Sequence, residues 1–230
     1  MDYRNKYLAI IPARGNSKRL PRKNILPFAG KPLVQWSIEA ALQCDFISKT
    51  VVSSDCPEIL SISRLPGVDL HERPKTLALD ESSSVDVVLD VLKNYEKFSY
   101  IVLLQPTSPL RCSADISDAI KCFERSWPLN SLISVCETDY NPILTNTLRK
   151  NKKMKNFFNK MQKDNKPLNS QKHYRINGAI YIISTDIFLE NRSFLNEETI
   201  AFIMKKEKSI DIDSKLDFEI AEFLKFNTVG

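Results

Sequence analysis

Apolar and polar residues alternate along this chain in blocks whose order predicts the fold. Continuous apolar runs of strand length, typical of strands buried on both faces, occur at residues 7–11, 49–53, 68–71, 100–104, 131–136, 178–183 and 199–204. Apolar residues at helical spacing predict helices at 33–42, from Pro57, after a serine cap at Ser82 or Ser83, at 114–123 and at 215–226. The last helix is expected to turn four apolar residues toward the core, namely Leu216, Ile220, Phe223 and Leu224. Since strands and helices alternate, we expect an α/β fold with a doubly wound, mostly parallel, Rossmann-like sheet covered on both faces.

The segment at 138–172 breaks this alternation. It is rich in Lys and Asn, and its few large apolar residues, which include Phe157, Phe158 and Met161, cannot bury much surface by themselves. We therefore interpret it as an excursion from the main sheet, within a single domain that covers residues 1–230. The whole chain has a net charge of +5, but residues 149–172 alone hold nine Lys or Arg and one acidic residue. Because the basic excess belongs to one segment, it indicates no nucleic-acid partner.

Composition narrows the class of protein further. No apolar run approaches the length of a membrane-spanning helix, and the first strand begins so close to Met1 that a signal peptide has no room. We therefore expect a cytoplasmic protein with no membrane partner. The five cysteines are scattered without a C-x-x-C pair and only two histidines occur, which argues against a disulfide framework and against a zinc site.

A basic loop follows the first strand, at residues 12–24. Five of its residues are basic and none is acidic: Arg14, Lys18, Arg19, Arg22 and Lys23. In a doubly wound sheet the ligand lies beside the carboxyl ends of the strands. Backbone N–H groups together with Arg and Lys side chains suit a triphosphate. The loop has neither P-loop nor G-x-G-x-x-G spacing, so a solvated basic turn remains the alternative.

Three further stretches carry candidate chemistry. Residues 105–111 follow the most apolar strand with a polar, proline-containing ledge, although an ordinary strand–helix loop has the same pattern. The Arg-x-Asn-Gly stretch at 175–178, before a strand, offers a guanidinium and an amide to a polyhydroxylated acid, or forms an Asn-Gly turn. Asp211 and Asp213 point to one side of an extended segment, where Mg²⁺ would relieve their repulsion. Asp213 also suits the N-cap of the last helix, so both interpretations stay open.

Several of these segments, in their order along the chain, resemble one family. The matching stretches are Pro12–Lys18 with Leu20-Pro21 and Lys23-Asn24, Arg73-Pro74, Ser82-Ser83, Leu103–Arg111, Tyr174–Tyr181 and Ser209–Asp213. Together they resemble the bacterial CMP-sialic acid synthetases, which belong to the sugar-activating cytidylyltransferases. The resemblance implies a sheet of the nucleotide-diphospho-sugar transferase kind and a reaction in which the anomeric hydroxyl of a nonulosonic acid attacks the α-phosphate of CTP. It also implies a CMP-sugar product for capsule or lipopolysaccharide biosynthesis.

The resemblance assigns roles by position. Nucleotide binding falls to Ala13, Arg14, Gly15, Asn16, Ser17, Lys18, Asn24, Arg73, Ser82 and Ser83, and catalysis to Arg14, Lys23, Gln105 and Asp213. Sugar binding falls to Gln105, Arg175, Asn177 and Tyr181. Asp211 and Asp213 are expected to hold Mg²⁺, with Mn²⁺ as a substitute. No residue is assigned as the general base. The segment at 138–172 is expected to form a dimerisation and lid excursion that completes the site of a partner copy in a homodimer.

One departure from the family pattern affects the substrate. Many members have an Arg-Gln-x-Leu-Pro stretch before Arg-x-Asn-Gly, whereas this chain has Leu-Asn-Ser-Gln-Lys at 168–172. The arginine that grips the sugar carboxylate has no clear counterpart, and a lysine such as Lys166 or Lys172 gives no bidentate contact. N-acetylneuraminate is therefore the first expected sugar, legionaminic acid the second and pseudaminic acid the third. An inactive nucleotide-binding regulator of the same fold is the alternative from another class.

Overall fold

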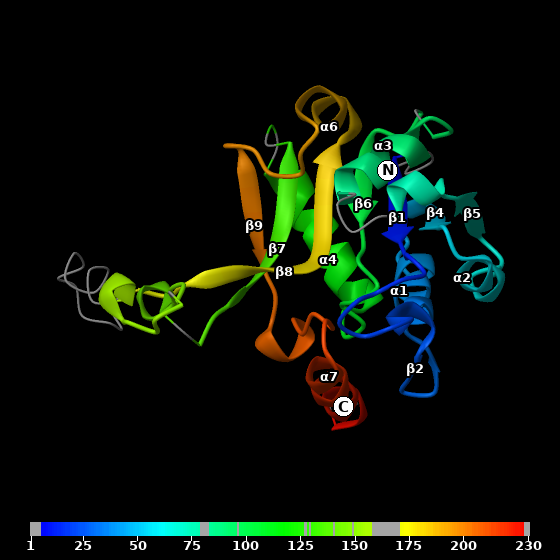
Figure 1. The fold of residues 1–230 in the computed structure, drawn as a ribbon. Coiled ribbons are helices and arrows are strands. Elements are labelled where there is room, and N and C mark those ends of the chain that lie inside the picture. The colour runs from blue at the N-terminus through cyan, green and yellow to red at the C-terminus, as the bar shows by residue number, and fades with distance from the viewer. Residues whose placement is uncertain are drawn as a thin grey trace.

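One twisted β-sheet organises the protein. The structure is a computed structural model that describes residues 6–78, 83–95, 97–126, 128, 130–139, 141–148, 150–157 and 171–227. Its seven-stranded sheet has the order β5-β4-β1-β6-β8-β7-β9 (Figure 1). The strands are β1 (Tyr7–Pro12), β4 (Ile47–Ser54), β5 (Val68–Glu72), β6 (Tyr100–Leu103), β7 (Ser131–Glu137), β8 (Tyr174–Ser184) and β9 (Thr199–Ile203). β8 runs antiparallel to β6 and β7 and the other pairs are parallel, which confirms the expected mostly parallel sheet.

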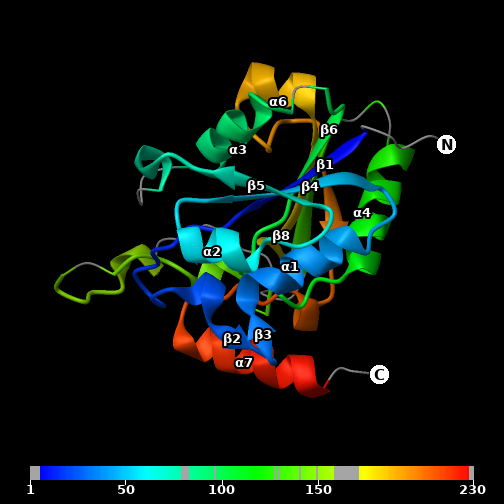
Figure 2. The same ribbon diagram turned by 90° about the vertical axis from the view of Figure 1, so that its right-hand side faces the viewer.

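Helices cover both faces of the sheet, because buried residues alternate along its central strands. Ala9 and Ile11 of β1 belong to the core under α1 (Leu33–Leu42), α2 (Pro57–Ile62) and α4 (Ser113–Arg125). Leu8 and Ile10 belong to the core under α3 (Ser84–Leu92) and α6 (Thr185–Asn191). The doubly wound arrangement is therefore confirmed (Figures 1 and 2). No helix in the described part of the chain combines the length and the apolar character needed to cross a lipid bilayer.

The C-terminal helix α7 (Lys215–Asn227) lies outside these layers, against the small hairpin of β2 (Pro27–Phe28) and β3 (Lys31–Pro32) (Figure 2). Phe218 packs edge-on against the Phe28 ring, with the ring centroids 5.4 Å apart. The Glu222 carboxylate accepts a hydrogen bond from the backbone N–H of Ala29 (2.8 Å). These two contacts fix which side of the helix faces the protein.

The inner face predicted for this helix was therefore mostly wrong. Leu216, Ile220 and Phe223 are 64%, 42% and 66% exposed, whereas Ala221 is fully buried. The apolar residues of α7 lie on two sides of the helix, so spacing alone could not show which side packs. The stripe of Leu216, Ile220 and Phe223 consequently faces away from the fold.

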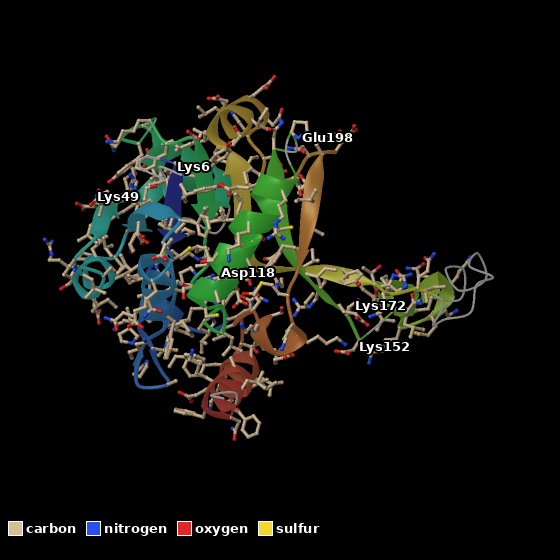
Figure 3. The ribbon with its side chains drawn as sticks, turned by 180° about the vertical axis from the view of Figure 1, so that it is seen from behind. Lys6, Lys49, Asp118, Lys152, Lys172 and Glu198 are labelled. Carbon is tan, nitrogen blue, oxygen red and sulfur yellow. The ribbon has the colours of Figure 1, made fainter. Side chains whose placement is uncertain are left out.

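An arm leaves the sheet between β7 and β8, and Figure 1 shows it projecting from the body of the protein. Its base continues the two strands, since Glu137 pairs with Tyr174 and the N–H of Thr138 donates to His173 O at 2.9 Å. The described part includes the 3₁₀ turn η3 (Pro142–Leu144). Figure 3 shows Lys152 and Lys172 on this arm, apart from the main fold. Phe158, Met161 and Lys166 lie outside the described residues.

A bulge inside β8 forms the corner at which the strand turns into the arm. Ile133 of β7 pairs with Tyr181, but Val135 pairs with Ile176, so the residues at 177–180 form what we call the β8 corner. Gly178 has φ +76°, a left-handed conformation that glycine adopts readily. The prediction that Arg-x-Asn-Gly precedes the strand was wrong, since it lies within an eleven-residue strand. A bulge and a turn both favour glycine at this position, and only the pairing distinguishes them.

Candidate active site

A cavity of about 320 Å³ opens beside the carboxyl ends of β1 and β6. Segments far apart in the sequence form its walls: Pro12, Arg14, Lys23, Asn24, Arg73, Leu77, Ser83, Ser84, Val87, Gln105, Pro106, Thr107, Asp211 and Asp213. This is the place where a doubly wound sheet binds its ligand. Cationic, amide and carboxylate side chains converge on it, so its chemistry suits a charged, polar ligand and a cation.

The basic loop is tied to the end of β4. The backbone N–H of Ala13 donates to Ser53 O (2.9 Å), and the N–H of Gly15 donates to Asp55 Oδ1 (2.9 Å). A Cβ at Gly15 would lie 2.8 Å from Cys56 Cβ, so only glycine allows this close approach. Sequence analysis missed the part played by Asp55, although its place after a buried strand was a signal.

Part of the basic loop forms one wall of the cavity. Arg14, Lys23 and Asn24 line the cavity, as the resemblance implied. Asn24 is buried, and its Nδ2 donates to the Arg14 carbonyl at 2.8 Å, which supports the loop from below. The other predicted loop residues lie beside the cavity and not on its wall: Ala13, Gly15, Asn16, Ser17 and Lys18.

Arg73, which directly follows β5, forms another part of the cavity wall. Arg73 is 5% exposed, and its guanidinium donates to the carbonyls of Ser53 (2.9 Å) and Leu77 (3.4 Å). Burial lowers the pKa of Arg73, and the charge of Arg14 lowers it further, while Asp55 opposes the shift. Two arginines that line one cavity favour an anionic ligand there.

Ser83 begins α3 and lines the same wall. Its Oγ accepts from the N–H of Asp86 (3.2 Å), and the Asp86 carboxylate accepts from the N–H of Ser83 (3.1 Å), which is a reciprocal cap. The expected serine cap is therefore confirmed at Ser83. Ser82 lies outside the described residues.

Asp211 and Asp213 form the wall opposite the basic loop. Lys23 Nζ bridges to this segment, with distances of 3.1 Å to Asp213 Oδ1 and 2.7 Å to the Ile212 carbonyl. Arg19 Nη2 lies 2.7 Å from Asp213 Oδ2. Ile212 is fully buried between the two acids, so both carboxylates are held at the cavity edge.

The alternative role of Asp213 as the N-cap of α7 is wrong. Ser214 forms this cap, since its Oγ accepts from the N–H of Asp217 (3.3 Å) while Asp217 Oδ2 accepts from the N–H of Ser214 (2.7 Å). Asp213 Oδ1 and Oδ2 instead contact Lys23 and Arg19. Its carboxylate therefore belongs to the cavity and not to the helix terminus.

Asp211 lies in an environment that a cation would complete. Burial raises its pKa, the nearby Asp213 charge raises it further, and a hydrogen bond from Thr107 lowers it in part. Its Oδ1 is buried and has no hydrogen-bond partner among the described residues. Two carboxylates, one with an unsatisfied oxygen, fit a Mg²⁺ ion whose other ligands come from phosphate and water. No group of three or more His, Cys, Asp or Glu residues gathers in the described chain.

The predicted sugar side is only partly at the cavity. Gln105 lines it, whereas Arg175, Asn177 and Tyr181 do not. Arg175 Nη2 donates to the Ser209 carbonyl (2.8 Å) near the base of the arm. Tyr181 packs against Phe194 with ring centroids 5.6 Å apart, and burial raises its pKa.

Asn177 is buried and has protein partners on its side-chain atoms. Its Oδ1 accepts from Ser134 Oγ (2.6 Å), and its Nδ2 donates to Ser209 Oγ (2.9 Å). Ser134 Oγ in turn accepts from the N–H of Ile180 (2.8 Å). Asn177 therefore fastens the β8 corner to β7 and to the segment that leads into Asp211.

The fold and the cavity together define an α/β nucleotidyltransferase architecture. A solved structure of CMP:2-keto-3-deoxy-manno-octonic acid synthetase complexed with CTP superposes with a TM-score of 0.73, over 97% of this chain and 100% of that one. The two sequences are 18% identical, so this likeness concerns the fold alone. A family model described as "Cytidylyltransferase" matches residues 8–221. The chain belongs to this cytidylyltransferase family.

Three of the curated relatives illustrate what the chain is similar to. The N-acylneuraminate cytidylyltransferase of Escherichia coli O18:K1:H7 is 36% identical over 95% of this chain and 52% of its own length. The CMP-N,N'-diacetyllegionaminic acid synthase of Legionella pneumophila is 33% identical over 95% of this chain and 96% of its own. The pseudaminic acid cytidylyltransferase of Campylobacter jejuni (serotype O:2) is 32% identical with the same coverage. The chain spans about half the length of the first curated relatives that it matches.

Proposed function

We propose that the protein transfers CMP from CTP to a nonulosonic acid and releases pyrophosphate. One observation carries the proposal: a single cavity joins the cationic Arg14 and Lys23 to the paired carboxylates of Asp211 and Asp213. This combination suits a triphosphate with its metal ion. N-acetylneuraminate is the first substrate in the proposal, since the relatives named N-acylneuraminate cytidylyltransferase are 36% and 35% identical to this chain, against 33% and 32% for the legionaminic and pseudaminic acid relatives. Legionaminic acid is the second and pseudaminic acid the third.

Cationic side chains bind the nucleotide in this proposal. Arg14 and Lys23 neutralise the triphosphate, and the charge that builds up on the leaving pyrophosphate strengthens both contacts. Backbone N–H groups of the loop, together with Ser17 and Lys18, complete the phosphate site. Arg73 and the residues at the start of α3 form the wall for cytosine and ribose. Catalysis is then mostly positioning and charge neutralisation, without a covalent intermediate.

Asp211 and Asp213 would hold the divalent cation. A bound Mg²⁺ neutralises phosphate charge and makes the α-phosphate more electrophilic. The protein residues contribute the placement: Thr107 orients the Asp211 carboxylate, and Lys23 keeps Asp213 at the cavity edge. Lys23 thus lies between the carboxylates and the proposed triphosphate and can contact both.

The sugar enters from the Gln105 side. The Gln105 amide lines the cavity, and a polyhydroxylated acid offers hydroxyl groups to it. We propose that Arg175 and Tyr181 reach the sugar's outer groups, and that Asn177 acts by fastening the β8 corner beside Gln105. Because CTP is an intracellular nucleotide, we also propose that the reaction takes place in the cytoplasm.

We propose a homodimer in which the arm packs on a second copy of the chain. The arm exposes large apolar side chains, among them Leu148 (59%) and Met154 (55%), and the α7 stripe adds a second exposed apolar surface. Exposed apolar groups of this extent favour a protein contact. Light scattering at micromolar concentration should give twice the chain mass. A monomeric mass with full activity would contradict the dimer.

The reaction is tested by pyrophosphate release. Purified protein is mixed with CTP, Mg²⁺ and one sugar from a panel of N-acetylneuraminate, N,N'-diacetyllegionaminate, pseudaminate and 2-keto-3-deoxy-manno-octonate. We expect release with one of the first three sugars, and a CMP-sugar of matching mass. If CTP binds but no sugar gives release, the inactive regulator replaces the enzyme as the best account. Release with CTP alone would indicate hydrolysis in place of transfer.

A further inference from the structure

A second buried arginine, besides Arg73, lies next to the Gln105 backbone. Arg111, in the loop between β6 and α4, is 2% exposed and is among the largest fully buried side chains of the protein. It does not line the cavity. Its hydrogen bonds nevertheless join three separate elements, one of which carries Gln105 of the cavity wall.

Each of these hydrogen bonds ends on a neutral oxygen. Arg111 Nη1 donates to the carbonyls of Ala179 (2.8 Å) and Gln105 (3.2 Å), and Nη2 donates to Ser37 Oγ (2.5 Å). Ala179 belongs to the β8 corner and Ser37 to α1. The guanidinium thus connects the ledge after β6, the β8 corner and the first helix.

No carboxylate neutralises this charge by direct contact in the described part of the chain. Asp115 attracts it, but its carboxylate accepts hydrogen bonds from the N–H of Cys112 (2.9 Å) and from Lys208 Nζ (2.8 Å). Burial outweighs that attraction and lowers the pKa of Arg111 to about 10. Burying an unpaired charge is unfavourable, and an apolar side chain could fill the space with less loss. Packing alone therefore gives no reason for an arginine here.

The Gln105 carbonyl is held more firmly than an ordinary loop carbonyl. It accepts from Arg111 Nη1 (3.2 Å), from Ser37 Oγ (3.4 Å) and from the N–H of Ser108 (3.3 Å). Its side chain points the other way, into the cavity, where Oε1 lies so near Gly178 that a Cβ there would come within 2.6 Å. The Gln105 backbone is thus bound on one side, while its side chain lies close to the β8 corner on the other.

We propose that Arg111 is a positioning residue for the sugar reaction, which holds the Gln105 backbone against the β8 corner so that the Gln105 amide meets the sugar in one orientation. The inference rests on the proposed function, and it adds a residue that touches neither substrate. Arg111 acts on the sugar half-site only, because its partners lie on that side while Arg14, Lys23 and Arg73 form the nucleotide side.

A double-mutant cycle tests this role. Arg111→Lys keeps the positive charge but cannot bridge all three oxygens, and Gln105→Ala removes the amide that Arg111 is proposed to place. We expect Arg111→Lys to lower kcat/KM for the sugar by about tenfold to a hundredfold, as a misplacement of about 1 Å does. The Kd for CTP, measured by calorimetry, should stay within about twofold of wild type. In the Gln105→Ala background, the same substitution should lower kcat/KM by less than about threefold.

Controls keep the outcomes separate. Arg125→Lys, on the exposed end of α4, should behave as wild type. Ser37→Ala removes one contact to the Gln105 carbonyl with little change in volume, and it should lower kcat/KM for the sugar in the same direction by a smaller factor. If the Arg111 variants do not fold, the Ser37→Ala cycle with Gln105→Ala decides the question.

Equal losses in both backgrounds, or an equal loss of CTP affinity, would show that Arg111 is only structural. Wild-type activity in Arg111→Lys or in Ser37→Ala would overturn the proposal as well. If the wild-type protein gives no product with any sugar, the proposed function fails and this inference fails with it, whereas an active wild type with either of the outcomes above overturns the inference alone.

Discussion

The two ends of the cavity are built from different kinds of interaction. At the Arg14 end, charged side chains from the loop line the same cavity as Asp211 and Asp213, and Lys23 and the exposed Arg19 pair directly with Asp213. At the Gln105 end, buried polar groups are joined by hydrogen bonds to neutral oxygens. The first arrangement supplies charge for binding, and the second supplies position. Substitutions at the two ends should therefore fail in different ways.

The largest expected effect belongs to the charged end. Asp213→Asn should lower turnover by about a hundredfold or more, because it weakens the proposed site for the divalent cation that neutralises the transferring phosphate. The melting temperature should change little, since Asp213 doesn't cap α7 and its pairs with Lys23 and Arg19 are partly exposed. EDTA should abolish wild-type activity, and Mg²⁺ or Mn²⁺ should restore it.

Asp118→Asn, an exposed acidic residue on α4, is the matched control and should be silent (Figure 3). Full turnover in Asp213→Asn would show that Asp213 holds no metal ion needed for the reaction. Asp211 and Asp213 would then serve only as partners of the cationic loop residues.

The β8 corner offers a sharper test of positioning. Gly178 and Gly30 both have positive φ values, +76° and +90°, so alanine at either should cost about 1 kcal/mol in the free energy of unfolding. Only at Gly178 does the added Cβ meet Gln105 Oε1, whereas at Gly30 nothing lies within 4 Å. Gly178→Ala should therefore lower kcat/KM for the sugar by about tenfold.

Gly30→Ala should lose stability alone, which thermal melts and steady-state rates of both variants can establish. If both variants lose activity equally, the account of the corner as a positioning element is wrong.

The smallest expected effect is a gain in stability, in contrast to the losses above, when Asp211 is replaced by Asn. Its pKa is raised in the folded protein, so folding favours the protonated form, and stability present at acid pH is lost as the pH rises through that pKa. In metal-free protein at neutral pH, Asp211→Asn should therefore raise the melting temperature, by about 2–4 °C for each kcal/mol gained. Near the ordinary carboxyl pKa, at about pH 4, the gain should shrink. A lower melting temperature at neutral pH would mean that the carboxylate stabilises the fold.

The difference between the two ends of the cavity also explains which parts of the site could be predicted from the sequence. The charges of the basic loop after the first strand, and the paired acids Asp211 and Asp213 before the last helix, are visible as patterns, and the apolar runs that alternate with helical segments predict the layered fold. The buried hydrogen bonds of Arg111 and Asn177 cannot be predicted from the sequence. The local sequence is equally typical of a polar loop at Arg111 and of a turn at Asn177. Their roles depend on burial and on partners that lie far away in sequence. The misassigned face of α7 has the same cause, since tertiary contacts at Phe28 and Ala29 set its rotation.

In this account the cavity has a nucleotide end at Arg14 and a sugar end at Gln105. Calorimetric titration of CTP, in the presence of Mg²⁺ and without sugar, tests this division most directly. Arg14→Ala should keep a native circular dichroism spectrum and raise the Kd for CTP by about tenfold to a hundredfold, as expected for the loss of a charged hydrogen bond. Gln105→Ala should leave the Kd for CTP within about twofold of wild type, although it lowers kcat/KM for the sugar in the pyrophosphate-release assay. Unchanged CTP affinity in Arg14→Ala, or equal losses in both variants, would contradict a nucleotide end and a sugar end.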